Sequence, residues 1–386
     1  MTAADATARL APETAAAGPA DRDRPKDRDR PKERDRKAEH IRLALDERTQ
    51  SDRTYFDDWA LEHRALPELD LAAIDTSVEF LGKRLAAPLL LSCMTGGTGE
   101  ASRINAHLAE AAERRGVAVG VGSQRKALED RSQVGSFQVR AAAPTVPLLA
   151  NLGAVQLNYG FGLAECRAAV EMIGADALVF HLNPLQEAIQ PEGQTDFSGL
   201  VARMAAVAAE LEVPVIAKEV GCGISGATAR TLAAAGIRIL DTAGLGGTSW
   251  ARIEAARAGD LPLGELFADW GIPTPESIRQ VAAVPGVTVI GSGGLRNGLD
   301  AAKAIALGAH LVGMAYPFLE AATESAERVA ERIDRIVREL RVAMFCAGAR
   351  SIEELRRSPI RNLLDGRRLA GTEVPHTQQI QERPTP

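Results

Sequence analysis

The sequence predicts an α/β fold, a (β/α)₈ TIM barrel, and two observations lead to this prediction. Eight short apolar runs recur along the chain, each ends in glycine or small polar residues, and helix-forming segments separate them. Apolar runs that alternate with helices indicate parallel strands, because a parallel connection needs a crossover helix. The length of 386 residues also suits a barrel, which takes roughly 250 residues as one domain.

A doubly wound sheet is the structural alternative. Such sheets usually have fewer strands, and their glycine-rich dinucleotide loop is expected near the start of the chain. The nearest glycine run, from Gly244 to Ser249, comes late and lacks a third glycine in the required place. The sequence therefore favours the barrel.

The predicted elements follow one another in a regular order. Strands are expected within residues 88–97, 117–124, 147–154, 177–184, 214–221, 237–244, 287–294 and 310–317. Alanine-rich helices are expected between strands, at residues 102–116, 198–212 and 298–308. Residues 321–357 carry apolar side chains at helical spacing. This last segment is predicted to be helical and to cover the outside of the barrel or to pack between subunits.

The two ends of the chain differ from the rest in composition. A near-repeat of alternating charge runs from Asp21 to Ala38 and offers nothing to bury. Residues 1–33 are therefore predicted to form a disordered charged tail. A single barrel domain is expected over residues 34–360, followed by a C-terminal tail over residues 361–386.

Composition and charge exclude several classes of function. The net charge of −6 gives no basic footprint for nucleic acid. The cysteines, which are Cys93, Cys166, Cys222 and Cys346, form no CxxC pair, so a zinc site or disulfide framework is not expected. The sequence has no apolar run of about 18 residues for a membrane helix and no apolar signal core at its N-terminus. These features predict a cytoplasmic protein without a membrane partner.

Polar side chains end seven of the eight predicted strands, and the last strand ends at Ala315. They are Thr95, Ser123, Asn151, His181 with Asn183, Lys218, Asp241 with Thr242, and Ser292. Any one of them could serve only a turn or a helix cap. Active sites of such barrels lie at the carboxyl ends of the strands, so seven polar ends predict a site at this rim.

Glycine-rich segments at the rim suggest that the site binds an anion. Gly291–Gly294 ends the seventh strand and Gly313–Ala315 the eighth, where such barrels usually bind phosphate through backbone N–H groups. Met94–Gly97 could flank a planar ring. Lys218 needs an anionic partner, which a reduced flavin would supply. Together these features predict a phosphorylated flavin.

Glu187 follows the fourth strand without histidine or cysteine partners at metal spacing. A hard cation such as Mg²⁺ takes one or two carboxylates together with substrate phosphates and water. The alternative interpretation is an exposed glutamate at the start of a helix. Basic side chains that could bind a diphosphate are available at Arg36, Lys37, His40 and Arg125, although Arg36 and Lys37 could equally end the charged tail.

From about Arg36 to Arg350, a series of motifs resembles the type 2 isopentenyl diphosphate isomerase family. These motifs are RKAEH, MTGG, GVGSQR, LLANLGAVQL, HLNPLQE, KEVGCGIS, GGTSW, FADWGIPT and GGLRNGLDAAKAIALGA. The resemblance implies an FMN-dependent barrel that interconverts isopentenyl and dimethylallyl diphosphate with Mg²⁺, for isoprenoid biosynthesis. It further implies reduction of the flavin by NADPH, no net redox change, and a homotetramer or homo-octamer.

The resemblance also implies roles for individual residues. FMN contacts are expected at Met94, Thr95, Gly96, Ser123, Asn151, Lys218, Thr248, Gly294, Leu295, Arg296, Ala315 and Tyr316. The small-molecule diphosphate substrate is expected at Arg36, Lys37, His40, Arg125, His181, Asn183 and Gln186. Glu187 is the expected Mg²⁺ ligand, and Gln186, His181 and Lys218 are the expected catalytic residues. Proton transfer is left open between Gln186 and N5 of the reduced flavin.

Two other functions compete with this interpretation. An FMN-dependent 2-hydroxy acid oxidase shares the barrel, but it needs a histidine base, and the sixth-strand region LDTAGLGGTSW has none. A flavin-binding sensor without catalysis would use the charged tail as its effector. The intact pair of Gln186 and Glu187 argues against the sensor.

Overall fold

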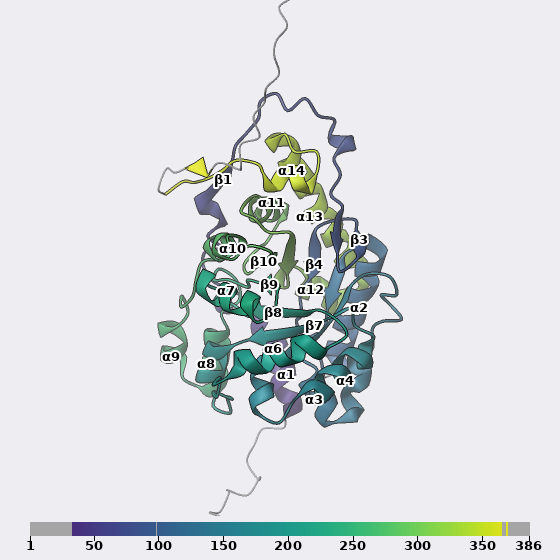
Figure 1. Cartoon of the computed structure of the whole chain (residues 1–386), viewed down its shortest axis with the longest axis vertical. Helices are drawn as coiled ribbons and strands as arrows, with labels where there is room; N and C mark the ends of the chain where they lie inside the picture. The colour runs from purple at the N-terminus through teal and green to yellow at the C-terminus, as the bar shows by residue number, and fades with distance from the viewer. Residues whose placement is uncertain (1–32, 98, 365–367, 370–386) are drawn as a thin grey trace, which may run out of the picture.

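Eight parallel strands close into one barrel in the computed structural model, which describes residues 33–97, 99–364 and 368–369 (Figure 1). The strands are β4 (Leu89–Leu91), β5 (Ala118–Gly120), β6 (Leu148–Gly153), β7 (Ala177–Leu182), β8 (Val215–Glu219), β9 (Ile239–Asp241), β10 (Thr288–Ser292) and β11 (Leu311–Met314). Each neighbouring pair is parallel, and β11 pairs with β4 to close the ring. The predicted (β/α)₈ barrel is therefore confirmed.

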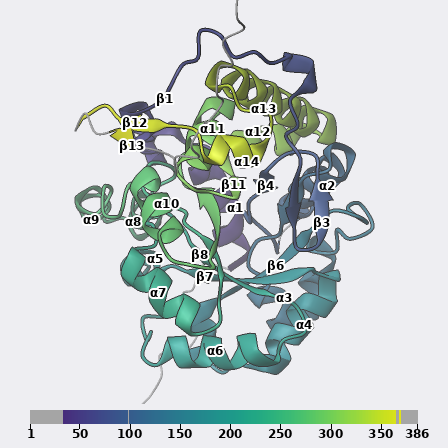
Figure 2. The same cartoon turned by 45° about the horizontal axis from the view of Figure 1, so that its top comes forward.

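Helices surround the strands, as the turned view shows for α4, α6 and α7 (Figure 2). They are α2 (Gly99–Arg115), α3 (Arg125–Glu129), α4 (Leu163–Ile173), α5 (Pro184–Ile189), α6 (Leu200–Glu210), α7 (Gly226–Ala234), α8 (Trp250–Ala258), α9 (Leu261–Leu266), α10 (Thr274–Ala282), α11 (Gly298–Ala306), α12 (Tyr316–Glu324), α13 (Ala326–Ala347) and α14 (Ile352–Arg356). Helix α13 packs against α2, α11 and α12, so the C-terminal segment covers the outside of the barrel. In the part of the chain that the structure describes, no helix is both long and apolar enough to cross a membrane.

The interior of the barrel has an apolar layer with a polar layer above it. The apolar layer takes one residue from each strand: Leu90, Ala118, Leu149, Val179, Ile216, Ile239, Ile290 and Leu311. A hairpin of β2 (Val78–Phe80) and β3 (Lys83–Leu85) adds Phe80 and Leu85 to this cluster. Lys83 pairs at 2.7 Å with Asp176, which directly precedes β7, so the hairpin covers the amino ends of the strands.

Alternation along a strand turns every second residue to the same side. The residue two positions after each apolar one therefore also points into the barrel, nearer the carboxyl ends. These residues are Ser92, Gly120, Asn151, His181, Lys218, Asp241, Ser292 and Gly313. A Cβ at Gly120 would lie 2.5 Å from Cys93 Sγ, and a Cβ at Gly313 would lie 2.7 Å from Ser92 Oγ, so glycine makes room in this layer. Six of its eight positions are polar, and all of these except Asp241 line the floor of a site.

An N-terminal segment crosses the carboxyl rim of the barrel before the first barrel strand. It begins with α1 (Glu33–Ala44), which contacts α8. The Thr49 carbonyl accepts a hydrogen bond from the Ser249 N–H, and the Ser51 N–H donates to the Gly247 carbonyl. The N-terminal segment thus brings α1 over the loop that follows β9.

The short 3₁₀ helices of the described residues are η1 (Glu47–Thr49), η2 (Phe56–Asp58), η3 (Leu71–Ala73), η4 (Arg131–Ser136) and η5 (Ala154–Asn158).

The predicted domain boundaries fall close to the ends of the described residues. The predicted charged tail, residues 1–33, lies outside them except for Glu33, which begins α1. At the other end, β12 (Ile360–Asn362) crosses the predicted boundary at residue 360. It pairs with β1 (Trp59–Leu61) and β13 (Arg368–Leu369) in a small antiparallel sheet. The remaining residues of the predicted C-terminal tail, 365–367 and 370–386, lie outside the described part.

Candidate active site

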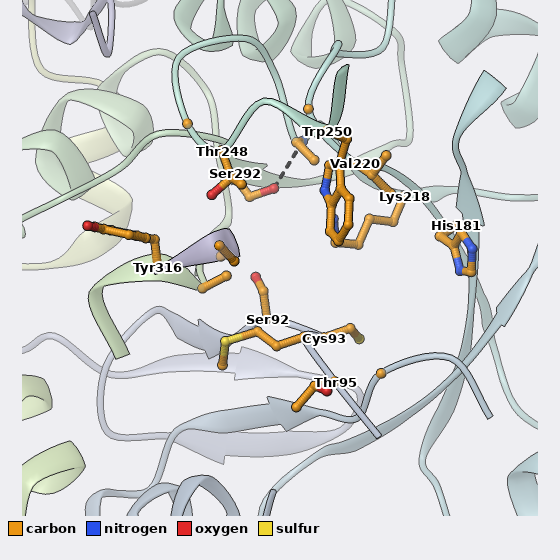
Figure 3. A pocket seen from close by; sticks show the side chains of 18 of the residues that line it. Ser92, Cys93, Thr95, His181, Lys218, Val220, Thr248, Trp250, Ser292 and Tyr316 are labelled. Atoms are coloured by element: carbon orange, nitrogen blue, oxygen red, sulfur yellow. Dashed lines mark hydrogen bonds between the residues drawn. The ribbon is translucent and has the colours of Figure 1, made fainter. Parts of the chain in front are cut away.

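A cavity of about 260 Å³ opens at the carboxyl ends of the barrel strands, and all eight strand ends contribute to its lining (Figure 3). Most of the residues predicted from the sequence line it. They are Lys37, His40, Met94, Thr95, Ser123, Arg125, Asn151, His181, Asn183, Gln186, Glu187, Lys218, Thr248, Gly294, Leu295, Arg296, Ala315 and Tyr316. The fold thus gathers side chains from α1 and from every strand end into one chamber.

Two predicted site residues are not part of this lining. A Cβ at Gly96 would lie 2.0 Å from the Phe137 ring, so Gly96 packs against that ring. Its role as an FMN contact stays a prediction. Arg36 belongs to α1, but its side chain is outside the described part of the structure, so its contact with a diphosphate also stays a prediction.

Interlocked glycine loops form one side of the chamber. Gly293 and Gly294, which follow β10, have φ angles of 108° and 74°, in the left-handed region that favours glycine. A Cβ on Gly294 would lie 2.1 Å from the Gly246 carbonyl oxygen, and one on Gly293 would lie 2.3 Å from the Gly244 oxygen. Side chains at these positions would push the two loops apart, so the close approach requires glycine.

A partly buried cation follows these glycine loops. The Arg296 guanidinium lies 4.4 Å from the centre of the Tyr316 ring, and its Nη2 donates to Gln50 Oε1 at 2.9 Å. Burial lowers the pKa of Arg296, and the nearby Tyr316 and Asp300 partly oppose this shift. The loops and this cation make a site that suits a phosphate group.

The floor of the chamber holds a neutral histidine. His181 Nδ1 lies 2.8 Å from Asn151 Oδ1, and because an amide oxygen only accepts, Nδ1 carries the hydrogen. Burial lowers the pKa of His181 to about 3, and the positive charges of Lys218 and Lys37 add to this shift. His181 therefore presents an uncharged imidazole in a fixed orientation.

We expect His181→Gln to make the free energy of unfolding depend less on pH in the acid range. The unfolded chain takes up this proton near the ordinary pKa of 6.5, whereas the folded chain resists it down to about 3. The free energy of unfolding should therefore fall as the pH falls through this window. Urea unfolding of the flavin-free protein between pH 6.5 and pH 4 measures the slope. The exposed residue His63 gives the control variant, His63→Gln. If the unfolding free energy of His181→Gln fell with pH as steeply as that of His63→Gln, His181 would already titrate as an exposed group.

The first turn of helix α5 positions Glu187. Asn183 caps α5 and Pro184 is its first residue, so the next turn faces the chamber. Asn183 Nδ2 donates to Gln186 Oε1 at 3.1 Å and to Glu187 Oε1 at 3.0 Å. The Gln194 N–H donates to Glu187 Oε2 at 2.6 Å. Glu187 is therefore a buried, fixed carboxylate, which rules out the interpretation of an exposed helix-start glutamate.

Glu187 fits a metal that takes most of its ligands from elsewhere. Within the described ranges, no group of three or more His, Cys, Asp or Glu side chains could hold a metal ion. One carboxylate together with substrate phosphates and water is a usual Mg²⁺ environment. The site suits this cation better than zinc, which needs several protein ligands.

Glu254 contacts two of the predicted site residues, Gln186 and His40, and sequence reasoning missed it. This residue of α8 is fully buried, and its Oε1 accepts from Gln186 Nε2 at 2.7 Å and lies 3.1 Å from His40 Nε2. Its Oε2 accepts from Arg257 Nη1. Burial raises the pKa of Glu254, but hydrogen bonds from His40 and Gln186 and the charge of Arg257 outweigh it and lower the pKa to about 2. Glu254 is thus an ionised carboxylate that fixes Gln186 and His40.

Other lining residues were also outside the predicted set. They include Ser92, Cys93, Gln156, Val220 and Trp250. Trp250 packs edge-on against His40, with ring centroids 5.3 Å apart. The alternation of β4 could have identified Ser92, because Ser92 lies two residues after the core residue Leu90.

Comparison with known proteins identifies the family of this chain. A model of the FMN-dependent dehydrogenase family matches residues 42–143 and 200–362. An isopentenyl-diphosphate delta-isomerase of Paracoccus zeaxanthinifaciens is 52% identical over 323 residues, which cover 81% of this chain and 93% of that protein. The chain belongs to the FMN-dependent, type 2 isopentenyl-diphosphate delta-isomerase family. An isomerase of the same name from Synechocystis is 48% identical over 335 residues, 85% of this chain and 96% of that protein.

Solved structures outside the isomerase family share the fold. A mandelate oxidase variant with a monooxide FMN adduct aligns with a TM-score of 0.57 and 20% identity, over 84% of this chain and 92% of that one. At such low identity the likeness concerns the barrel alone. In this chain β9 ends at Asp241 and is followed by Thr242 and Ala243, so the residues after this strand include no histidine of the kind that the oxidase alternative needs as its base.

Proposed function

We propose that this protein interconverts isopentenyl and dimethylallyl diphosphate, using reduced FMN and Mg²⁺. The observation that carries the proposal is one chamber with two chemically distinct sides. Glycine loops and Arg296 form an anion site on one side. Lys37, His40, Arg125 and Glu187 provide a second set of charged groups for a diphosphate and its metal. Tyr316 and His181 lie on opposite sides of the chamber (Figure 3).

The chamber fits FMN because it offers a site for each part of the molecule. The Gly293–Arg296 loop would hold the phosphate. Lys218 lines the floor, where its ammonium would face the ring, and Asn151 and Ser123 line the chamber as further polar contacts. Reduced FMN, when bound, supplies a proton donor and acceptor at N5 and a negative charge near N1. The cation of Lys218 would stabilise that charge.

On the substrate side, this chain's residues bind and orient the diphosphate. Lys37 and Arg125 supply positive charge, and Glu187 holds Mg²⁺ against the phosphate oxygens. Gln186 is fixed by two partners, since its Nε2 donates to Glu254 and its Oε1 accepts from Asn183. Helix α1 places Lys37 and His40 over the chamber, where it would exclude water from the reacting carbons.

Glu254 and His181 are not suited to protonate the alkene. Glu254 is ionised, because its pKa is about 2, and His181 is neutral, because its pKa is about 3. A proton on carbon must therefore come from another group. Reduced FMN would supply a proton donor and acceptor for this step, and Gln186 would lie beside the alkene to orient it or to share in the proton transfer.

We also propose a reductant, a location and an assembly for the working enzyme. NADPH would reduce the flavin before turnover, and the protein would act in the cytoplasm as a homotetramer or homo-octamer. Light scattering after size exclusion tests the assembly, and the rate of flavin bleaching by NADPH under nitrogen tests the reductant.

Anaerobic incubation tests the function. The protein with FMN, NADPH and Mg²⁺ should convert isopentenyl diphosphate to its dimethylallyl isomer. Binding of FMN without any isomer formed would identify a flavin-binding sensor. Bleaching of the flavin by a 2-hydroxy acid such as lactate, instead of by NADPH, would identify an oxidase.

Two N-terminal deletions test the role of α1. Removal of residues 2–32 should leave turnover and thermal stability near wild type, because this charged sequence has no apolar pattern with which to join the core. Removal of residues 2–40 also deletes Lys37 and His40, so it should raise KM for the diphosphate. A several-fold loss of activity in the shorter deletion would contradict this division.

A further inference from the structure

Lys218 lies between His181 and Asp241 in the polar layer of the barrel interior, and Asp241 is the one of the three that does not line the chamber. On β7, β8 and β9 the partners in register are His181 with Lys218 and Lys218 with Asp241. Residues paired in register on parallel strands point to the same side of the sheet. Asp241 therefore points into the barrel next to Lys218, and only 1% of its surface is exposed. The proposed function gives this buried carboxylate no role.

Asp241 is held in this buried position by a hydrogen bond. Ser292 Oγ accepts from the Ala243 N–H at 3.0 Å, so the serine hydroxyl hydrogen is available to its other partner, Asp241 Oδ1. Oδ1 thus acts as an acceptor. An ionised carboxylate away from water is costly unless a cation offsets its charge. Burial raises the pKa of Asp241 above its usual range, and the charge of Lys218 and the Ser292 hydrogen bond oppose this rise only in part.

We infer that Asp241 is the counter-ion of Lys218 and that, through Lys218, it limits how strongly the chamber prefers reduced over oxidised FMN. Lys218 Nζ donates to the Glu219 carbonyl at 2.7 Å. Asp241 makes no direct contact with this ammonium, so it would cancel part of the positive charge across the space between β8 and β9. Asp241 acts through Lys218, so it is a positioning residue and not a catalytic one. The inference rests on the FMN binding of the proposed function, but it does not depend on isomerisation.

A redox titration of the holoenzyme measures this effect directly. In Asp241→Asn, the ratio of dissociation constants for oxidised and reduced FMN should rise about tenfold, an increase in midpoint potential of about 30 mV for a two-electron couple. In Lys218→Met, the midpoint potential should fall, because the cation that stabilises the anionic reduced flavin is gone. An unchanged potential in Asp241→Asn would mean that Asp241 is protonated, and would overturn the inference.

A double-mutant cycle separates action through Lys218 from a direct effect on the flavin. Without Lys218 the buried Asp241 should take up a proton, so adding Asp241→Asn to Lys218→Met should change the ratio by less than about twofold. An equal shift in both backgrounds would show that Asp241 acts on the flavin independently, and would contradict the counter-ion role.

Glu219 is the competing counter-ion, because it follows Lys218 directly. Its Oε2 accepts from the N–H groups of Val220 to Gly223, which already compensate its charge. The cycle of Glu219→Gln with Lys218→Met should therefore be close to additive. A coupling as large as that of Asp241 would move the role to Glu219 and overturn the assignment.

Unfolding of the flavin-free protein provides the same cycle when a variant loses FMN. Lys218→Met leaves Asp241 without its cation, and Asp241→Asn leaves Lys218 without its anion, so each should destabilise the fold. The double variant should be more stable than the sum of the two losses predicts. Additive losses of unfolding free energy would count against the pair. If Asp241→Asn gave little soluble protein, a double variant with an equally low yield would count against the pair as well.

Discussion

Glu187→Gln is expected to lower turnover by more than about 100-fold, since changes even to residues behind a metal ligand often cost 10–100-fold. The amide is a poorer ligand than the carboxylate for a hard cation. It also disturbs the hydrogen bonds from Asn183 and from the Gln194 N–H, which need an acceptor on each oxygen. Initial rates across a Mg²⁺ titration measure the loss. FMN should stay bound, because Glu187 lies on the substrate side of the chamber.

A nearby carboxylate gives the matched control. Glu192 follows helix α5, is exposed, and pairs with Arg257. Glu192→Gln should keep its Mg²⁺ dependence, since its charge does not face the chamber lining. Loss of FMN from Glu187→Gln, with normal turnover in the remaining holoenzyme, would place Glu187 on the flavin side and refute the metal assignment.

Glu254→Ala is expected to reduce kcat by about 100-fold, the loss that a small misplacement of reacting groups can cause. Without this carboxylate, Gln186 loses the partner of its Nε2, and His40 loses the anion 3.1 Å from its ring. KM for the diphosphate should also rise, because His40 belongs to the substrate side. The flavin midpoint potential should not change, since Glu254 is assigned to orient the substrate and not the ring.

Glu265 offers a control of the same type on the neighbouring helix α9. It also accepts from an arginine, Arg252, but it is exposed. Glu265→Ala should therefore behave like wild type in rate and in potential. If Glu254→Ala kept its kcat while its thermal stability fell, Glu254 would serve packing and not the orientation of Gln186.

Much of the fold could be predicted because each barrel strand is a local pattern. The run around β9 shows the principle, since Ile239 and Leu240 are apolar and Asp241 is the first polar residue at the rim. The location of the site could be predicted for a similar reason. Parallel strands bring their carboxyl ends together, so polar strand ends far apart in sequence meet in space.

The connections between side chains could not be predicted from the sequence. Glu254 lies at an ordinary helix position, and its importance arises only because α8 packs against α5 and α1. The distance from Asp241 to Ser292 in the chain gives no sign of their hydrogen bond, which depends on the neighbouring positions of β9 and β10. The packing of Gly96 against Phe137 was likewise not visible in the sequence, and its contact with FMN stays a prediction.

In the proposed reaction, the chamber moves a double bond by proton transfer, with a reduced flavin that is not consumed. The most direct test counts dimethylallyl diphosphate formed per NADPH oxidised, under nitrogen with Mg²⁺ and excess isopentenyl diphosphate. We expect one NADPH to be oxidised for each flavin at the start, followed by many product molecules without further NADPH loss. Oxidation of one NADPH for every product molecule, or no isomer from a fully reduced holoenzyme, would contradict it.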